Sequence, residues 1–248
     1  MSNFVRDLVL FDGSITPAFV PTSISGLQLW LDASDATTIT LDGSNNVEQW
    51  RDKASTNHAA QASTLLRPDM STVNSLGAVQ FDAVDDLLTG TEIFTANNPF
   101  TMFAVVRRDG ATTTERVAYF IAGTDEFFGL SIGSNGAASG RPGYLNGGVA
   151  WRPEGGSDLY NGDVVLQQLS RTPNATSYLR YPGAVSQSNT DTPTATPYGV
   201  YRIGWQGGAG IARQATTVCE IIVYDSDLSA GNKTSVRAYL GAKWGVTV

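Results

Sequence analysis

Short apolar runs of four to eight residues recur along the chain from Gly26 onward, and residues that favour turns separate them. Runs of this length between Gly, Asn and Asp predict β-strands rather than helices. Dipeptides such as Asp109-Gly110 and Asn146-Gly147 supply the positive φ angles of tight hairpins. The strands are expected at Leu27–Leu31, Thr38–Leu41, Val47–Trp50, Ala78–Phe81, Phe100–Arg107, Arg116–Ala122, Phe127–Ile132, Val164–Leu169, Ala175–Tyr181, Tyr198–Trp205 and Thr217–Tyr224.

Two of these runs indicate how the strands are layered. The stretch from Phe100 to Val106 is apolar on both faces, which is typical of a strand buried between two layers. The run Tyr198–Trp205 alternates instead, with Tyr201 and Ile203 on one face and Arg202 on the other, so one side is expected to face solvent.

Long loops and one helix complete the pattern. Ser186–Pro197 and the glycine-rich Gly133–Gly156 are expected to be loops. Near the C-terminus, Ser229 can cap a run in which Val236, Leu240 and Trp244 fall on one face, and Gly245 can end it. We therefore predict a helix over Ser229–Trp244 that packs against the outside of the sandwich.

Composition supports an all-β fold. The 248 residues include only three Lys and six Glu, but 26 Thr, 26 Gly and 13 Asn, which favour sheets and turns over helices. All-β domains commonly use 200–250 residues as one unit. The fold class predicted is an antiparallel two-sheet jelly-roll sandwich with one C-terminal helix, spanning residues 24–248.

Residues 1–23 are predicted to form a separate N-terminal arm. The segment is apolar, yet Pro17 and Pro21 interrupt it before the first strand of the domain. An apolar arm needs a surface to bury it, so we expect it to serve assembly, or alternatively to fold back onto its own domain and cover a sheet edge. The residues expected to make these contacts are Phe4, Val5, Leu8, Leu10 and Phe11.

Charge and cysteine content exclude several classes of protein. The formal net charge of −7 argues against a nucleic-acid binder, and no stretch approaches the 18 apolar residues of a membrane span. No secretion signal is recognised, and the single cysteine, Cys219, excludes an internal disulfide. Cys219 lies mid-strand and is expected in the core.

The motifs of common catalytic and metal sites are missing. His58 is the only histidine, so a zinc site with two His ligands is excluded, and no nucleophile elbow or phosphate-binding loop occurs. Glu48 and Glu220 lie inside predicted strands, where pairing with Arg is the simpler interpretation. No catalytic residue, metal site or cofactor is therefore predicted, although two carboxylates brought together by the fold would change this.

Acidic clusters and exposed aromatics remain as candidate binding residues. The clusters at Asp82/Asp85/Asp86, Asp32/Asp35 and Asp225/Asp227 can bind Ca²⁺, but capping of local backbone N–H groups is the simpler interpretation. In the glycine-rich region aromatic rings alternate with polar residues and arginines, an arrangement that can stack on a sugar ring and bond its hydroxyls. The glycan-binding candidates are Tyr144, Trp151, Arg152 and Tyr160, with anchoring of the loop as the alternative role.

Several segments together resemble a known family. The matching segments are Gly26–Asp35, Val47–Lys53, Asn57–Gln61, Arg67-Pro68, Val79–Leu88, Glu220–Ser229 and Tyr239–Gly245. They resemble laminin-G-like jelly-roll domains of the concanavalin A-like superfamily, as found in bacterial surface proteins and phage virion proteins. In that family the position of His58 belongs to a structural strand motif, and most members bind glycans or proteins without catalysis.

The resemblance implies a function that the residues alone do not give. We expect a non-catalytic structural or adhesion protein of a phage virion, as a capsid decoration, head-fibre or tail protein that folds in the host cytoplasm. Its expected partners are other virion proteins, further copies of itself and a host-surface glycan. The alternatives are a lectin-like protein of the bacterial cell surface and a glycan hydrolase on the same fold, which requires two carboxylates facing each other in a groove.

Overall fold

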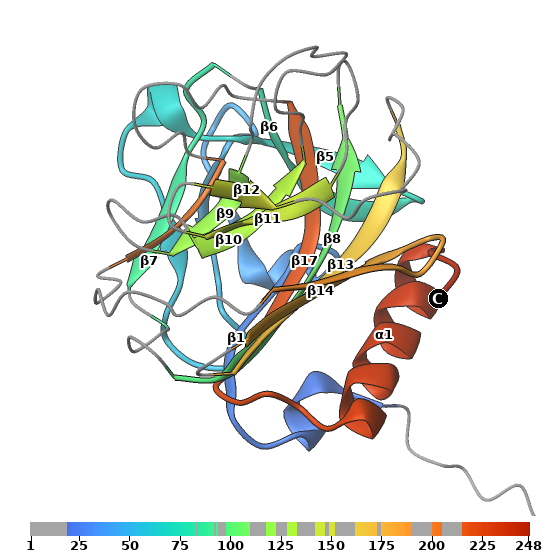
Figure 1. The fold of residues 1–248 in the computed structure, drawn as a ribbon. Helices are drawn as coiled ribbons and strands as arrows, with labels where there is room; N and C mark the ends of the chain where they lie inside the picture. The colour runs from blue at the N-terminus through green and yellow to red at the C-terminus, as the bar shows by residue number, and fades with distance from the viewer. Residues whose placement is uncertain are drawn as a thin grey trace, which may run out of the picture.

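The computed structural model describes the chain at residues 19–82, 84–91, 93, 98–109, 118–122, 128–132, 142–146, 149–151, 162–172, 175–189, 200–204 and 215–248. Within these residues the protein consists of two antiparallel β-sheets packed face to face, with one C-terminal α-helix against the outside of one sheet (Figure 1). The predicted all-β two-sheet sandwich with a C-terminal helix is thus confirmed.

The first sheet, called sheet A here, carries the strongest apolar strands. Strand β17 lies at its centre, pairing with β8 on one side and with β6 and β1 on the other. Its described strands, in spatial order, are β15 (Val185–Asn189), β14 (Ala175–Tyr181), β13 (Val164–Thr172), β8 (Phe100–Arg108), β17 (Thr216–Tyr224), β6 (Leu76–Phe81) and β5 (Asp69–Val73), with β1 (Leu27–Asp32) also on β17.

The second sheet, sheet B, has shorter strands. It joins segments distant in sequence, because β16 pairs with both β7 and β9. Its described strands, in spatial order, are β12 (Val149–Trp151), β11 (Pro142–Asn146), β10 (Phe128–Ile132), β9 (Ala118–Ala122), β16 (Val200–Ile203), β7 (Leu88–Thr91), β4 (Ala59–Ala60), β3 (Val47–Trp50) and β2 (Ile39–Leu41). The part of the chain that the structure describes also has three short 3₁₀ turns, η1 (Pro21–Ser23), η2 (Ala36–Thr38) and η3 (Thr64–Leu66).

The hydrophobic residues of sheet A form two cores because both of its faces are covered. Met102, Ala104 and Val106 of β8 face sheet B, whereas Phe103 and Val105 face the helix. This explains why the run from Phe100 to Val106 is apolar on both faces. In sheet B the alternation in β16 also follows the prediction, since Tyr201 and Ile203 are fully buried and Arg202 is half-buried.

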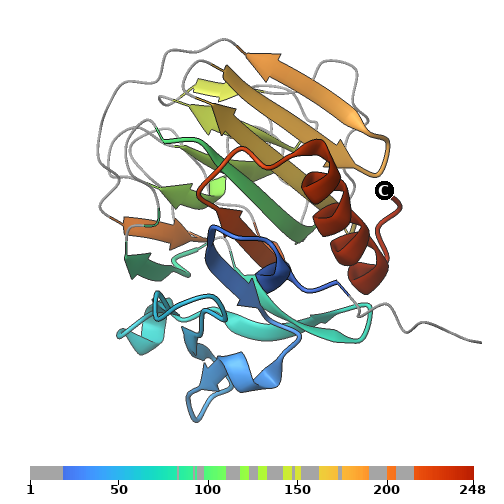
Figure 2. The same ribbon diagram turned by 90° about the horizontal axis from the view of Figure 1, so that it is seen from below.

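Helix α1 (Ala230–Trp244) ends where the sequence indicates. The Ser229 hydroxyl accepts a hydrogen bond from the Asn232 N–H at 3.2 Å, and Gly245 adopts the left-handed conformation at φ 71°. Val236, Leu240 and Trp244 are fully buried against sheet A (Figure 2). None of the helices in the described residues is long and apolar enough to cross a membrane.

Six of the described strands occur where no apolar run predicts one. Strands β11 and β12 lie in the predicted loop Gly133–Gly156, and β15 begins one residue before the predicted loop Ser186–Pro197. Strands β4, β5 and β7 were also unpredicted, since β4 has only two residues and neither β5 nor β7 is a continuous apolar run. The two loop predictions were wrong because these strands form by pairing with a neighbouring strand and carry no apolar run of their own.

The end of the predicted arm lies against the domain. Pro21 is buried, and its carbonyl accepts a hydrogen bond from the Tyr224 hydroxyl at 3.0 Å. The Phe19 ring lies 5.8 Å from the Tyr239 ring of α1. The assembly residues predicted at Phe4, Val5, Leu8, Leu10 and Phe11 lie outside the described residues, so their role stays a prediction.

Candidate carbohydrate-binding site

The outer face of sheet B carries a row of mostly polar side chains that crosses the strands. Adjacent positions in the row are paired residues of neighbouring strands, and paired residues share a face of the sheet. On β2 and β3 the alternate residues Ile39 and Trp50 belong to the inner face, so this row faces outward. The row runs through Thr40, Gln49, Ala60, Thr89 and Arg202.

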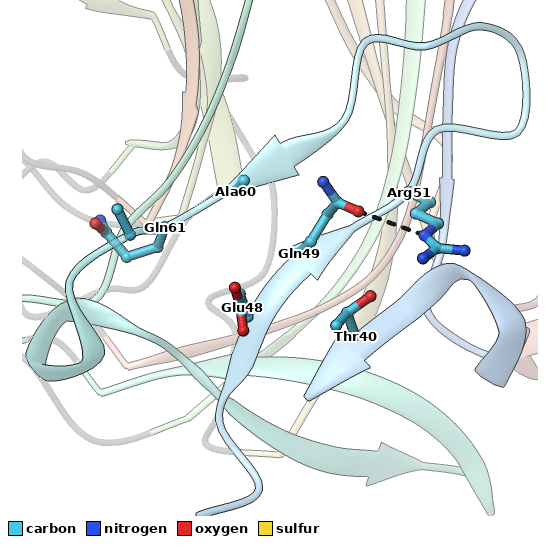
Figure 3. A pocket seen from close by; sticks show the side chains of 7 residues that line it. Thr40, Glu48, Gln49, Arg51, Ala60 and Gln61 are labelled. Carbon is cyan, nitrogen blue, oxygen red and sulfur yellow. Dashed lines mark hydrogen bonds between the residues drawn. The ribbon is translucent and has the colours of Figure 1, made fainter. Parts of the chain in front are cut away.

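One end of this row is hollowed into a pocket of about 340 Å³. The pocket is lined by Thr40, Glu48, Gln49, Arg51, Ala60, Gln61 and Ala62. Figure 3 shows the Gln49 amide between the strands of Thr40 and Ala60, with its oxygen directed toward Arg51. The Arg51 Nε donates to the Gln49 Oε1 at 3.4 Å, so a guanidinium and an amide are presented side by side.

Arg67 supports the wall of this pocket from behind. Its side chain is 8% exposed, and its Nη1 lies 3.1 Å from Asp42 Oδ2, whereas its Nη2 lies 3.6 Å from Glu48 Oε1. The Arg67 Nε also donates to the Gln61 carbonyl at 2.9 Å. Arg67 therefore ties β3 to the segment after β4 and holds Glu48, whose side chain is 49% exposed, at the pocket. The expected pairing of Glu48 with an arginine is confirmed.

Asp42 is held in its ionised form. The backbone N–H groups of Ser44 and Asn46, together with the Arg67 guanidinium, lower the pKa of its carboxyl below the usual range. Asp42 and Glu48 thus flank one guanidinium, and Glu48 is the one of the two that lines the pocket.

The chemistry of the pocket suits a polyhydroxylated ligand. A guanidinium supplies several donors, a carboxylate supplies acceptors, and an amide supplies both. Vicinal hydroxyls of a sugar can bond to such neighbouring groups in pairs, and the methyl groups of Ala60 and Ala62 offer a small apolar surface for C–H groups.

A second set of charges is buried beneath α1. Glu220 is fully buried and accepts four hydrogen bonds: from Trp30 Nε1 at 2.7 Å, Tyr239 OH at 3.0 Å, Trp244 Nε1 at 2.8 Å and Lys243 Nζ at 2.7 Å. Burial raises the pKa of Glu220, and Lys243 opposes that rise. Its partner is a lysine of the helix rather than the expected arginine, so that interpretation was wrong.

The Glu220 network joins the helix to the sheet rather than forming a site. Lys243 Nζ also lies 2.7 Å from Asp32 Oδ1, and Lys53 Nζ lies 3.1 Å from Asp32 Oδ2 and 2.8 Å from Asp35. Each of these groups has partners within the network, which makes it a structural connection between β1, β17 and α1.

The acidic cluster after β6 contains a carboxyl with an unusual pKa. The carboxylate oxygens of Asp82, Asp85 and Asp86 lie within 4.8 Å of one another. Asp82 accepts hydrogen bonds from the N–H groups of Val84 and Asp85, and Asp86 accepts one from the Asp82 N–H at 2.7 Å. Burial and the adjacent carboxylates raise the pKa of Asp86 to about 7.

The structure does not test the glycan-binding residues expected from the sequence. Tyr144 and Trp151 are paired on β11 and β12, in line with Leu130 of β10, and their side chains lie outside the described residues. Arg152 and Tyr160 also lie outside the described residues, so all four stay predictions.

The lone histidine and the lone cysteine are integrated into the fold. The His58 Nδ1 accepts a hydrogen bond from the Asp52 N–H at 3.0 Å, and Cys219 is buried beneath α1. Burial raises the pKa of the Cys219 thiol above its usual range. Both observations agree with the structural roles expected for these residues.

The pocket residues Gln49 and Arg51 were missed by sequence reasoning. The available signal was the polar pair Glu48-Gln49 inside a strand that begins with Val47 and ends with Trp50, followed by Arg51. Polar residues between buried ones mark an exposed strand face. The sequence did not show that β2 and β4 pair with β3 on its two sides, which is what makes Gln49 a pocket residue.

The fold has been compared with known proteins. No family model matches the sequence, and no curated protein matches it either. Among solved structures, the sialidase of Trypanosoma rangeli is 18% identical with a TM-score of 0.62, over 89% of this chain. This chain spans about a third of the sialidase, because the match covers 33% of that chain.

Two further structural neighbours are also carbohydrate-active proteins. Domain 4 of AbnA, an extracellular arabinanase of Geobacillus stearothermophilus in complex with arabinotriose, is 11% identical with a TM-score of 0.59, and the match covers 85% of this chain and 97% of that one. An arabinofuranosidase complexed with arabinofuranosyl-α-1,2-xylobiose is 13% identical with a TM-score of 0.63, over 91% of this chain and 60% of that one. At such identities the likeness shows the fold alone.

These comparisons correct two of the expectations. The expected non-catalytic phage virion protein is wrong, because the structural neighbours are a sialidase, an arabinanase domain and an arabinofuranosidase. The expectation that the chain is no enzyme is contradicted by the same neighbours.

Proposed function

We propose that this chain binds carbohydrate at the pocket around Gln49 and acts in the breakdown of glycans. The observation that carries the proposal is the pocket itself, which presents the amide of Gln49, the guanidinium of Arg51 and the carboxylate of Glu48 on the open face of sheet B. The comparisons support it, since the neighbours are named for carbohydrate-acting proteins and two of their structures hold arabinose-containing saccharides.

The expected affinity follows from the number of polar groups. The pocket offers three side chains that can each make one or two hydrogen bonds to hydroxyls, and each such bond contributes about 1 kcal/mol net. The sum gives a dissociation constant on the order of 1 mM for a short saccharide. The described lining contains no aromatic side chain that would add stacking energy.

The proposal is tested by isothermal titration with arabinotriose, xylobiose and sialyllactose. Gln49→Ala and Arg51→Ala should each weaken binding of the preferred saccharide about fivefold or more. Gln28→Ala is the matched control, because Gln28 is a polar residue of β1 that bonds to Asp225 away from the pocket. No binding of any of the three saccharides, or equal binding by all variants, would contradict the proposal.

Hydrolysis by the chain itself is the second candidate function. The observation that favours it is the placement of Asp42 and Glu48 on either side of Arg67, since glycoside hydrolysis uses two carboxylates near one bond. Glu48, which is ion-paired with Arg67, would first have to take up a proton from solvent before giving it to the leaving oxygen, and the ionised Asp42 would act as nucleophile or base.

Release of nitrophenol from a nitrophenyl arabinofuranoside tests this second candidate. Glu48→Gln and Asp42→Asn should each lower the rate at least 100-fold if the pair is catalytic. Turnover that survives both substitutions would remove the pair from the mechanism, and no turnover by the unmodified protein would leave binding as the function.

A further inference from the structure

A second pocket lies on the opposite side of the sandwich, on the outer face of sheet A. Its volume is about 330 Å³, close to that of the pocket on sheet B. It is lined by Gln168, Ser177, Tyr178, Leu179, Ser186 and Ser188 of strands β13, β14 and β15. We propose that this pocket is a second, independent saccharide site, so that one molecule holds two separate glycan chains; the saccharide class rests on the proposed function.

The strand register aligns hydroxyl groups across this pocket. Ser177 of β14 is paired with Ser188 of β15, and on its other side with Ser170 of β13. Paired residues share a face, and neighbouring strands lie about 4.8 Å apart. Ser170 is buried beside the pocket, so Ser177 and Ser188 present neighbouring hydroxyls in it, at a spacing close to the length of one sugar unit in a chain. Ser177 and Ser188 are exposed, so their hydroxyls are open to a ligand.

Gln168 is held in one orientation at the helix side of the pocket. Arg237 of α1 donates from Nη1 to the Gln168 Oε1 at 2.6 Å, which turns the amide nitrogen away from the helix. That nitrogen makes only a long contact of 3.4 Å with the Ser170 hydroxyl among the described residues. The amide thus has donor capacity in a fixed direction, as a specific polar site requires. Helix α1 lies against sheet A (Figure 2), and through Arg237 it fixes a side chain of the pocket lining.

The lining indicates a neutral ligand with many hydroxyls. No ionised side chain lines the described part of this pocket. The half-buried Leu179 is paired with Gln168 on one neighbouring strand and with Ser186 on the other, and it offers an apolar surface between them. Hydroxyls, one oriented amide and one aliphatic surface are suited to the hydroxyl and C–H groups of an uncharged sugar. The pocket on sheet B differs, because Glu48 and Arg51 bring charges to it.

The two pockets lie too far apart to bind one short saccharide together. The two pockets open on outer faces of different sheets, and packed sheets lie about 10 Å apart. A short saccharide in one pocket cannot extend into the other through the core. When both pockets are occupied by short saccharides, the protein therefore links two glycan chains instead of binding one chain at two points.

Amide chemical shifts in a ¹H–¹⁵N titration with arabinotriose and with xylobiose test the inference. We expect two separate groups of shifting amides, one on β2–β4 and one on β13–β15. Ser186→Tyr fills the second pocket and should remove the β13–β15 shifts, while the dissociation constant at the first pocket stays within twofold. Ser235→Tyr, an exposed serine of α1 outside both pockets, is the matched control and should change neither group.

The outcomes distinguish the second saccharide site on sheet A from the proposed function at the pocket on sheet B. Shifts confined to β2–β4 would overturn the second site and leave the proposed function standing. Shifts at β13–β15 that persist in Ser186→Tyr would also overturn it. Shifts confined to β13–β15 would support the second site and contradict the first, whereas no shift with either saccharide would contradict both.

Discussion

Replacing the buried Glu220 by glutamine should destabilise the protein strongly, although the two side chains have nearly the same shape. The carboxylate accepts two hydrogen bonds on each oxygen, from Trp30 and Tyr239 on one and from Trp244 and Lys243 on the other. In Glu220→Gln one oxygen becomes an NH₂ group, which cannot accept. Two buried donors then lose their acceptor and face another donor.

The magnitude follows from these two lost bonds. A buried donor left without an acceptor costs about 1–3 kcal/mol, and the Lys243 ammonium loses one of its two carboxylate partners as well. The free energy of unfolding should therefore fall by about 3–5 kcal/mol, in the range found when one member of a buried ion pair is removed. The residue is fully buried, so solvent screening does not reduce this effect.

Urea unfolding followed by tryptophan fluorescence measures the change. Asp227→Asn is the matched control, because Asp227 forms an exposed ion pair with Lys233 of α1. This substitution should lower the free energy of unfolding by less than about 1 kcal/mol. A loss below 1 kcal/mol in Glu220→Gln would refute the reasoning, since it would mean that the four donors do not depend on an ionised acceptor.

Two further predictions concern stability. Because the pKa of Asp86 is raised to about 7 in the folded protein, its contribution to stability is full below pH 4 and is lost as the pH rises through 7. Thermal melts in EDTA should therefore show Asp86→Asn more stable than the unmodified protein at pH 8, by roughly 2–4 kcal/mol, and equal to it at pH 4; equal melts at pH 8 would contradict this. The same melts with millimolar Ca²⁺ should match those in EDTA, and a rise of many degrees would show that the Asp82 cluster binds metal. Ser229→Ala removes the cap of α1 and should cost about 1 kcal/mol in urea unfolding, whereas Ser229→Asp should retain stability; an unchanged Ser229→Ala would show that the hydroxyl contributes nothing.

The helix and the central strands could be predicted because their own residues specify them. Val236, Leu240 and Trp244 repeat at helical spacing between a capping serine and a glycine, and the helix begins and ends within one residue of the prediction. Strand β8 is buried on both faces, so its apolar run identifies it without knowledge of its neighbours. In helix α1 and strand β8 the local sequence pattern and the burial in the folded protein therefore specify the same structure.

The edge strands and the pocket could not be predicted for the same physical reason. Strand β15 contains Ser186 and Ser188, whose positions in a strand depend on pairing with β14 rather than on an apolar face. Gln49 becomes a pocket residue only because β2 and β4 lie on either side of β3. Such features depend on the topology of the whole sheet, which the short-range pattern of the sequence does not contain.

A crystal of the protein soaked with arabinotriose tests the central claim most directly. The account predicts electron density for sugar in the pocket on sheet B, with hydroxyls within hydrogen-bond distance of the Gln49 amide and the Arg51 guanidinium, and no such density in crystals of Arg51→Ala soaked in the same way. Sugar bound elsewhere on the molecule with this pocket empty, or identical density in Arg51→Ala, would contradict it.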